Sequence, residues 1–324
     1  MAQLTVIIPV KNGAFTLDKC LESIREQSLK DVDILILDSG STDESLRIAA
    51  KYNCRIVEIE PASFNHGETR NKGAQLARTE LVFFTVQDAW LSNETVLSRM
   101  SKWFDDLAVM GVTGHQAIPY GEKDKNPAYW FKPVSEPIPE IRHFPALQEF
   151  ELLSAATKFE FSSWDDVVAM YRRSALKQVP FAKTNFSEDW LWAQEALGKG
   201  FKLVRDPGLV MYHYHHMLFN YTFKTKFIIA YHFYIYFQHI TKIPWSLMPL
   251  MKAMYRIIKN DQFSFVKKIG WIIHNTKMSF AIFLSVVTFR LSLALGGDKL
   301  LSRAYKYICP AAPQGISNIK PGKI

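Results

Sequence analysis

The stretch LTVIIPVKNG, residues 4–13, opens with a continuous apolar and β-branched run that stops at Pro9. A run of this kind is typical of a strand that is buried on both faces of a sheet. Apolar residues then recur at helical spacing from Leu17 to Ile24, so the sequence predicts a strand, a loop and a helix in succession. This succession is the unit from which a parallel sheet with covering helices is built.

The same order of elements repeats further along the chain. Three more apolar runs predict strands at residues 33–38, 55–59 and 81–86. Helices are expected after the STDE capping box formed by Ser41 and Glu44, from Glu68 to Ala77, and after Ser92. Strands that alternate with helices predict a parallel sheet that is covered on both faces.

Polar residues follow three of the predicted strands at the point where each strand ends. Lys11 and Asn12 follow the first strand, Asp38 ends the second, and Asp88 follows the fourth. Ligands of such sheets bind beyond the carboxyl ends of the strands, where an acid can hold a divalent cation against a diphosphate. The alternatives are a turn residue for Asp38 and a helix cap for Asp88, although Ser92 is better placed for that cap. The coincidence of three polar strand ends favours a binding site.

The composition disfavours several classes of protein. The 324 residues are 48% hydrophobic without a repeat or a low-complexity tract, which predicts one large domain with an appendage, or two domains. The three cysteines, Cys20, Cys54 and Cys309, form no CxxC pair, which disfavours a disulfide framework or a zinc site and favours a reducing compartment. No signal peptide is predicted, because the short first apolar run lacks a preceding basic region. The absence of GxGxxG and GxxxxGKS/T motifs disfavours a Rossmann dehydrogenase and a P-loop NTPase.

The net charge of +8 is unevenly distributed along the chain. Residues 1–200 contain 22 Lys and Arg against 28 Asp and Glu, whereas residues 201–324 contain 17 against 3. The basic part is also rich in aromatic residues, as in FNYTFKTKFIIAYHFYIYFQHITKIPW, residues 219–245. Basic, aromatic and apolar residues together are typical of a surface that contacts anionic lipid. Nucleic acid is disfavoured because the aromatic residues occur in blocks with Ile and Leu and not singly between cations.

One segment of the basic part is long enough for a membrane span. Residues 278–295 carry a single charge, Arg290, and a helix of this length extends over about 27 Å, near the thickness of the bilayer core. The sequence is compatible both with a helix that spans the membrane and with a helix that lies in its interface. Because Arg290 is costly inside a bilayer and basic residues crowd the preceding segments, we expect helices that lie in the membrane interface or pack on the N-terminal α/β domain.

Five motifs, TVIIPVKNG, ILDSGSTDES, FNHGETRNKGA, VQDAW and SEDWLWAQEALGKGFKLV, occur in an order and spacing that resemble family 2 glycosyltransferases, which are inverting enzymes. FNHGETRN, GHQAIPY, VVAMYRR and MYHYHH resemble the rhamnosyltransferase branch of bacterial surface-polysaccharide assembly. The resemblance implies an α/β GT-A fold, a Rossmann-like mixed sheet flanked by helices. It divides the chain into a GT-A domain at 1–220, with a nucleotide-sugar half at 1–115 and an acceptor-side half at 116–220, and a helical membrane-associating region at 221–324.

The resemblance implies a donor site that consists of Pro9, Asn12, Asp38, Arg70, Gln87 and Asp88. Asp38 would accept hydrogen bonds from the base or ribose, and the Arg70 guanidinium would face the diphosphate. The family's metal motif is Asp-x-Asp, and its first acid is missing here because Val86, Gln87 and Asp88 take its place. A QDA triplet is usual in the rhamnosyltransferase branch, so Asp88 would ligate the metal while diphosphate and water complete the shell.

A second metal ligand is implied by the MYHYHH motif. His213 matches the position at which many GT-A enzymes have a histidine near the metal or the leaving diphosphate, and His215 and His216 follow closely. For His216 a surface role is the favoured alternative. A lone carboxylate suits Mg²⁺, whereas a carboxylate with an imidazole favours Mn²⁺, and both cations stay open.

An inverting transfer needs a base that removes the proton of the acceptor hydroxyl. Glu188 and Asp189 begin a predicted helix, where acids are also common simply because they match the helix dipole. The second acid of the family's ED motif is usually the base, which implies Asp189 as base and Glu188 as its support. Asp166 is a candidate for binding an acceptor hydroxyl, and Arg172 is a candidate for binding a phosphate. For each residue, membership of a solvated charge pair is an equal alternative.

The leading hypothesis is an inverting glycosyltransferase that moves rhamnose from dTDP-rhamnose to a polyprenyl-diphosphate-linked glycan, such as O-antigen, at the cytoplasmic face of the bacterial inner membrane. A UDP-hexose donor is the first alternative. A nucleotidyltransferase would need a basic, glycine-rich loop after the first strand, and PVKNGAF is poor in both. The missing acid of Asp-x-Asp favours a non-catalytic binding module, whereas the set of Arg70, Asp88, Asp189 and His213 disfavours it.

Overall fold

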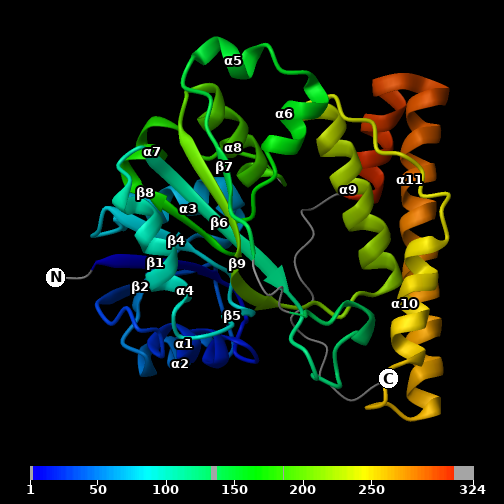
Figure 1. Cartoon of the computed structure of the whole chain (residues 1–324), viewed down its shortest axis with the longest axis horizontal. Helices are drawn as coiled ribbons and strands as arrows, with labels where there is room; N and C mark the ends of the chain where they lie inside the picture. Colours follow the sequence, from blue (N-terminus) through cyan, green and yellow to red (C-terminus); the bar gives the residue numbers. More distant parts are fainter. Residues whose placement is uncertain (1–2, 133–136, 185, 310–324) are drawn as a thin grey trace. The chain divides into compact units, whose positions relative to one another are not determined.

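The computed structural model describes residues 3–132, 137–184 and 186–309 (Figure 1). The chain forms two compact units, the first from residues 1–117 and 133–213 and the second from residues 118–132 and 214–324. The division was predicted after residue 220, but the first unit ends at residue 213, and the internal segment 118–132 belongs to the second unit. The end of the predicted basic region, residues 310–324, lies outside the described residues.

The first unit is built on a nine-stranded mixed sheet with the order β3-β2-β1-β4-β8-β6-β9-β5, in which β7 pairs with β9. The strands are β1 (Leu4–Val10), β2 (Val32–Asp38), β3 (Arg55–Glu58), β4 (Leu81–Phe84), β5 (Ala89–Leu91), β6 (Val109–Ala117), β7 (Glu140–Arg142), β8 (Ala169–Arg172) and β9 (Lys202–His213). The four predicted strands are confirmed and run parallel. The mixed sheet that the resemblance implies is confirmed as well, because β8 lies antiparallel to both β4 and β6.

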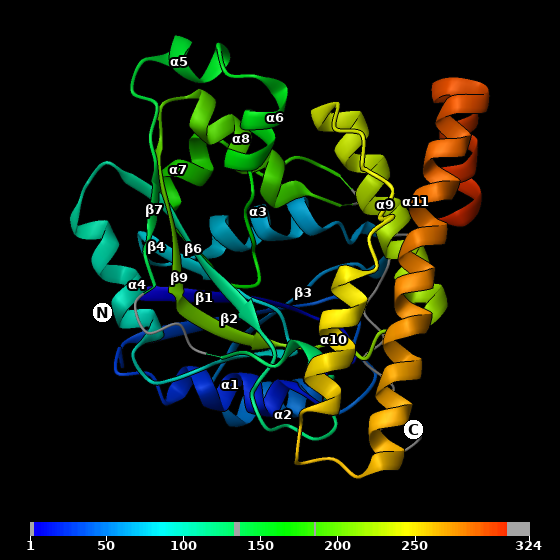
Figure 2. The same cartoon turned by 45° about the vertical axis from the view of Figure 1, so that its right-hand side comes forward.

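Helices cover both faces of this sheet, as predicted. They are α1 (Leu17–Arg25), α2 (Ser45–Lys51), α3 (His66–Leu76), α4 (Val96–Lys102), α5 (Leu147–Glu151), α6 (Ala155–Phe161), α7 (Arg173–Gln178) and α8 (Glu188–Gly198), with 3-10 turns η1 (Pro61–Ser63) and η2 (Trp103–Asp105). Figures 1 and 2 show α1 and α2 on one face and α3, α7 and α8 on the other. Neighbouring residues of β1 therefore enter different cores, Val6 and Ile8 on one side and Ile7 on the other.

Two helix starts differ from the sequence predictions. α2 begins at Ser45 with Glu44 as its N-cap residue, and the predicted capping box of Ser41 and Glu44 is wrong because Glu44 makes no side-chain cap hydrogen bond. The hydroxyl of Ser41 donates instead to the acid that ends β2. α4 begins at Val96, so Ser92 does not cap it. Short polar side chains in both loops bind their own loop backbone, which competes with capping.

The second unit is helical. It contains η3 (Pro127–Tyr129), α9 (Phe219–Phe237), α10 (Met248–Ile258) and α11 (Phe265–Ile308). One buried hydrophobic cluster in it consists of Ala128, Trp130, Ala253, Ile257, Phe263 and Trp271. Among the described residues, α11 is the one helix that is long and apolar enough to cross a membrane by length and composition. Its helical geometry is interrupted at Gly296 and Gly297, directly after the apolar segment predicted at 278–295.

Candidate active site

The loops that follow β1 and β2 hold each other at the carboxyl ends of the strands. Asn12, in a left-handed conformation with φ of 48°, donates its N–H to Ser41 Oγ at 2.9 Å and accepts from the N–H of Thr42 at 2.8 Å. Buried Asp38 accepts from the N–H groups of Gly40 and Ser41 at 3.0 Å. Both predicted donor-site residues therefore shape the loops in which the nucleotide was expected to lie.

Gln87, the residue before Asp88, joins the loop after β4 to the loop after β1. Its Oε1 accepts from the N–H of Lys11 at 2.9 Å, and its Nε2 donates to the carbonyl of the same residue at 3.2 Å. A Cβ at Gly13 would lie 2.6 Å from Oε1, so the approach is close. A carboxylate can only accept, so an amide is the group that can make both bonds. Pro9 lies in β1, opposite Leu37 of β2.

Asp88 and His213 are brought together by strand pairing. β5 follows Asp88 at once and pairs antiparallel with β9, so that Ala89 lies opposite His213. Asp88 Oδ1 lies 3.4 Å from His213 Nε2, and the two side chains are 16% and 12% exposed. Because a strand and not a helix follows Asp88, its alternative role as a helix cap is wrong.

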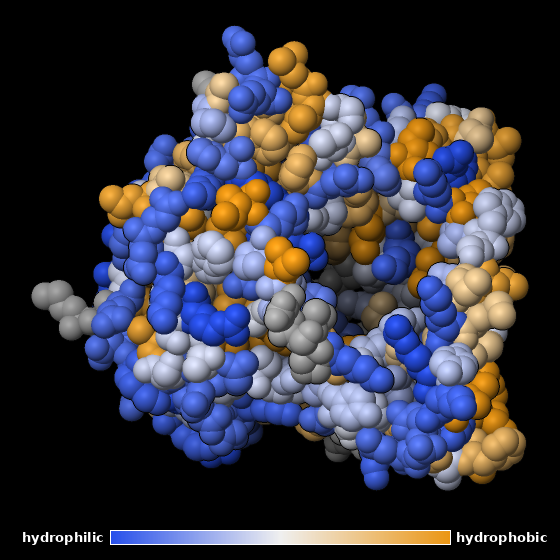
Figure 3. Space-filling model, viewed as in Figure 1, coloured by the Kyte–Doolittle hydropathy of each residue, from blue (hydrophilic) through white to orange (hydrophobic). Residues whose placement is uncertain are grey.

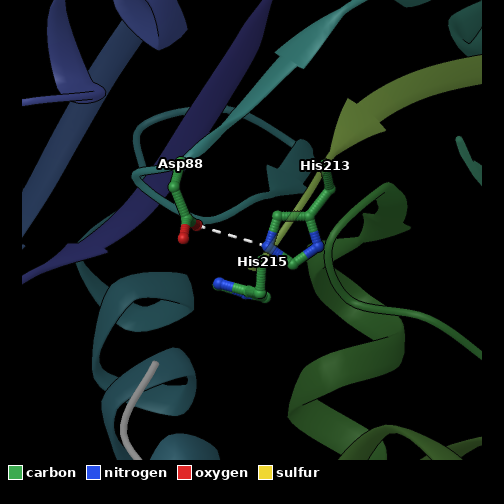
Figure 4. A group of neighbouring side chains, drawn as sticks. All are labelled: Asp88, His213 and His215. Carbon is green, nitrogen blue, oxygen red and sulfur yellow. Dashed lines mark ion pairs between the residues drawn. The ribbon is translucent and has the colours of Figure 1, made fainter. Parts of the chain in front are cut away.

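His215, the second residue after β9, stays near His213 through the chain and adds a third donor. Each of the three side chains offers one ligand atom, and these atoms lie within 4.8 Å of one another (Figure 4). Adjacent ligand atoms of a six-coordinate Mg²⁺ lie about 3 Å apart, because each bond is about 2.1 Å long. The 3.4 Å between Asp88 and His213 is close to this spacing, so the donors present fit a divalent cation. Imidazole beside carboxylate suits Mn²⁺.

A buried charge network lies between α3, β8 and α8. Nε of Arg70 lies 3.1 Å from Asp166 Oδ2, and its Nη1 donates to Glu188 Oε1 at 2.5 Å. The hydroxyl of Tyr171 donates to Asp166 and accepts from Trp164 Nε1 at 2.7 Å. From the sequence, Arg70, Asp166 and Glu188 were expected to have three different roles, and the structure places them in one network. Two buried acids around one guanidinium leave an excess of negative charge.

Burial and this excess charge together raise the pKa of two acids, Asp166 and Asp189. Burial raises the pKa of Asp166 to about 7, with Arg70 opposing the rise and Glu188 adding to it. Burial also raises the pKa of Asp189 well above its ordinary value, and the carboxylates of Glu188 and Asp166 raise it further. Asp189 is half-buried, and its Oδ1 accepts from the N–H of Trp190 at 2.8 Å. A perturbed acid of this kind is typical of a proton acceptor in catalysis.

The FNHGETRN motif explains how α8 is held. The Asn71 side chain bonds both the N–H and the carbonyl of Phe181 at 2.9 Å, and Asn65 Nδ2 donates to the Thr184 carbonyl at 2.8 Å. A Cβ at Gly67 would lie 2.2 Å from a carbonyl oxygen of the same segment. The motif on α3 therefore fixes the chain that leads into α8. The motif was visible in the sequence, but its partner lies more than a hundred residues away.

Gln116 was missed as a candidate, although it lies within the GHQAIPY motif. It bonds His213 Nδ1 at 2.7 Å and donates to Asp165 Oδ2 at 2.6 Å. Arg172, in contrast, is not brought to the site. It ends β8 opposite Leu81, the first residue of β4, whereas Asp88 follows the other end of β4. Its guanidinium donates to backbone carbonyls, at 2.9 Å to Val109 and at 2.6 Å to residue 104.

Comparisons with known proteins agree with this architecture. The model of glycosyl transferase family 2 matches residues 5–179. The O-antigen chain rhamnosyltransferase RfbN of Salmonella typhimurium is 30% identical over 233 residues, which cover 69% of each chain. The O-antigen chain rhamnosyltransferase WbaN of Salmonella anatum is 30% identical over 237 residues, 70% of each chain.

Two solved structures share the fold. S. aureus TarS 1-349 aligns with a TM-score of 0.54 at 17% identity, over 96% of this chain and 81% of that chain. The mannosyltransferase PcManGT from Pyrobaculum calidifontis, in complex with GDP-Man and Mn²⁺, aligns with a TM-score of 0.54 at 15% identity, over 94% and 84%. At these identities the agreement concerns the fold alone.

Proposed function

Since this chain belongs to glycosyl transferase family 2, we propose that it is an inverting rhamnosyltransferase that uses dTDP-rhamnose and a lipid-linked glycan acceptor. The observation that carries the proposal is the pairing of Asp88 with His213 at the end of the sheet, in the same unit as the buried acid network of Asp189. The choice of rhamnose is supported by the two Salmonella relatives, which are O-antigen chain rhamnosyltransferases.

The proposed roles follow from the contacts of each residue. Asp88, His213 and His215 would hold a divalent cation, which neutralises charge on a donor diphosphate when it is bound. Asp189 removes the proton of the acceptor hydroxyl, since its raised pKa gives it a high affinity for a proton. Arg70 holds Glu188 beside this base.

The remaining predicted residues act on the donor side. Asn12 and Asp38 hold the loops that receive the nucleotide, and Gln87 holds the backbone of Lys11 against the loop that carries Asp88. These hydrogen bonds fix the loops before the donor arrives, which lowers the entropic cost of binding. Family membership disfavours the nucleotidyltransferase and the non-catalytic module.

We further propose that the second unit brings the active site to the membrane that carries the acceptor. Exposed apolar residues recur along α10 and α11, and they include Met251, Tyr255, Val266, Phe280 and Leu295. Figure 3 shows apolar side chains gathered along α11. With 17 basic against 3 acidic residues from 201 to 324, this surface complements anionic lipid. Arg290 of α11 is exposed, which suits a helix in the interface.

A transfer assay tests the function. The full chain is incubated with dTDP-rhamnose or a UDP-hexose, Mn²⁺, and lipid-linked glycan extracted from O-antigen-producing bacteria. Rhamnose incorporation into the lipid fraction, abolished by chelator, is the expected result. Incorporation from the UDP-hexose alone would replace the donor assignment, and no incorporation from either donor would contradict the proposed function.

A further inference from the structure

The contacts of Gln116 determine which ring nitrogen of His213 is available as a ligand. Gln116 lies in β6 opposite Met211 of β9, so its side chain lies within reach of His213 at the end of β9. Its amide lies between two groups, with Oε1 2.7 Å from His213 Nδ1 and Nε2 2.6 Å from Asp165 Oδ2. The residues belong to the first unit.

The direction of these bonds follows from the chemistry of the carboxylate. An ionised carboxylate only accepts hydrogen bonds, so the Gln116 amide must turn its NH₂ group toward Asp165. Its oxygen then faces His213 Nδ1, and that nitrogen must carry a hydrogen to donate. In the neutral imidazole the lone pair is therefore on Nε2, the nitrogen that lies 3.4 Å from Asp88 Oδ1.

Asp165 is itself held, so the amide cannot easily turn over. Its Oδ1 accepts from the N–H of Val167 at 3.0 Å, and its backbone carbonyl accepts from Thr113 Oγ1 at 3.2 Å. Oδ2 is thereby directed at Gln116. A metal-binding histidine commonly donates its second ring N–H to an oxygen that fixes the tautomer and the ring orientation.

We infer that Gln116 is a positioning residue that, anchored by Asp165, fixes the Nδ1–H tautomer of His213 and directs its Nε2 lone pair to a divalent cation shared with Asp88. The inference deepens the proposed function and rests on it only for the presence of the cation. Neither Gln116 nor Asp165 was assigned a role from the sequence.

The first test measures the affinity of the full chain for Mn²⁺ alone by isothermal titration calorimetry. Gln116→Met keeps the length of the side chain but removes both hydrogen bonds, and it should weaken binding by about 10- to 100-fold, the usual effect of losing such a partner. Gln178→Met is the matched control, because Gln178 is exposed on α7, and it should bind as the wild type.

A charge-conserving exchange separates positioning from general structural damage. Gln116→Glu alone places two carboxylates face to face and should weaken Mn²⁺ binding. Gln116→Glu with Asp165→Asn restores the pattern, because the introduced carboxylate accepts both from His213 Nδ1–H and from the introduced amide. The double variant should recover to within about threefold of the wild type, since the net charge and every hydrogen bond are kept.

The tautomer is observed directly by long-range ¹H–¹⁵N correlation spectra of histidine-labelled, metal-free protein, with His213 assigned by its loss in His213→Gln. Neutral His213 should carry its proton on Nδ1 in the wild type and lose this preference in Gln116→Met. Wild-type Mn²⁺ affinity in Gln116→Met, no recovery in the double variant, or no Mn²⁺ binding by the wild type would each overturn the inference. Intact Mn²⁺ effects without sugar transfer would overturn the proposed function and leave this inference standing.

Discussion

Asp189 is the residue on which the proposed chemistry depends. Its carboxyl group is half-buried. Burial and the negative charges of Glu188 and Asp166 raise its pKa. An acid of this kind holds a proton more tightly than an ordinary aspartate and is therefore a stronger base once it is ionised. The same shift requires that the enzyme work at a pH high enough to ionise it.

Asp189→Asn tests this role. The amide keeps the shape of the side chain but cannot accept the proton, so transfer should fall by at least about 100-fold. Donor nucleotide binding should stay within about threefold of the wild type, because the base acts on the acceptor. The two quantities are measured by rhamnose incorporation and by calorimetry, and a loss of nucleotide binding with an intact fold would contradict the assignment.

Asp166 predicts a pH dependence of stability. Its pKa is raised from 3.8 to about 7 in the folded chain, so the folded state holds this proton more tightly than the unfolded state. The stabilising contribution of Asp166 is fully present below its unfolded-state pKa of 3.8, and it is lost as the pH rises toward its folded-state pKa of about 7. Urea unfolding from pH 4 to pH 7.5 should show a flatter pH dependence for Asp166→Asn than for the wild type. An unchanged pH dependence would contradict the shift.

At the scale of elements, α3 and the segment that leads into α8 act as one support. Asn71→Ala removes both hydrogen bonds to the backbone of Phe181 and leaves these groups unpaired. The variant should lower the free energy of unfolding by about 2 kcal/mol in urea denaturation and reduce transfer, since the start of α8 carries Asp189. Gln75→Ala, on the exposed side of the same helix, is the control and should change neither. Equal free energies of unfolding for the two variants would contradict the claim that α3 stabilises the segment that leads into α8.

The elements of the nucleotide-binding half were predictable because their patterns are local. β1 to β4 and the helices between them each show a continuous apolar run or a helical period in the sequence. The start of α2 was not predictable in this way. Ser41 could bind either the acid before it, Asp38, or the first turn of the helix after it, and it binds Asp38. β5 was missed since three residues, Ala89–Leu91, are too short to show a period.

The candidate site was predictable as a set of residues but not as an arrangement. The resemblance identified Asp88, His213 and Asp189 as separate residues. Which side chains surround them depends on the pairing of β5 with β9 and on the contact of α3 with α8. Arg70 and Glu188 are separated by 118 residues, and no local pattern indicates such a contact. Gln116 was missed and Arg172 was misplaced for the same reason, since the mixed order of the sheet places Gln116 beside His213 and Arg172 at the far end of β4.

At the scale of the whole molecule, the chain joins a first unit of mixed charge to a basic helical unit, and the proposed membrane role depends on that difference. The full chain should sediment with vesicles of anionic phosphatidylglycerol, and binding should weaken as salt rises from 50 to 500 mM. Met251→Gln with Tyr255→Gln removes exposed apolar groups of α10 and should weaken binding about tenfold. Leu107→Gln is the control, because Leu107 is an exposed apolar residue of the first unit. Unchanged vesicle binding by the α10 variant would contradict the proposal that this surface contacts the membrane.

The central claim is a metal-dependent site for a nucleotide-sugar donor, and calorimetric titration of dTDP into the full chain tests it most directly. The titration is run with Mn²⁺ and with chelator, on the wild type and on Asp88→Ala, with UDP and GDP as competing nucleotides. The account predicts that the wild type binds dTDP only with Mn²⁺ and that Asp88→Ala loses most of this binding, because it removes a carboxylate ligand of the cation. Equal dTDP binding with chelator, or in Asp88→Ala, would contradict it.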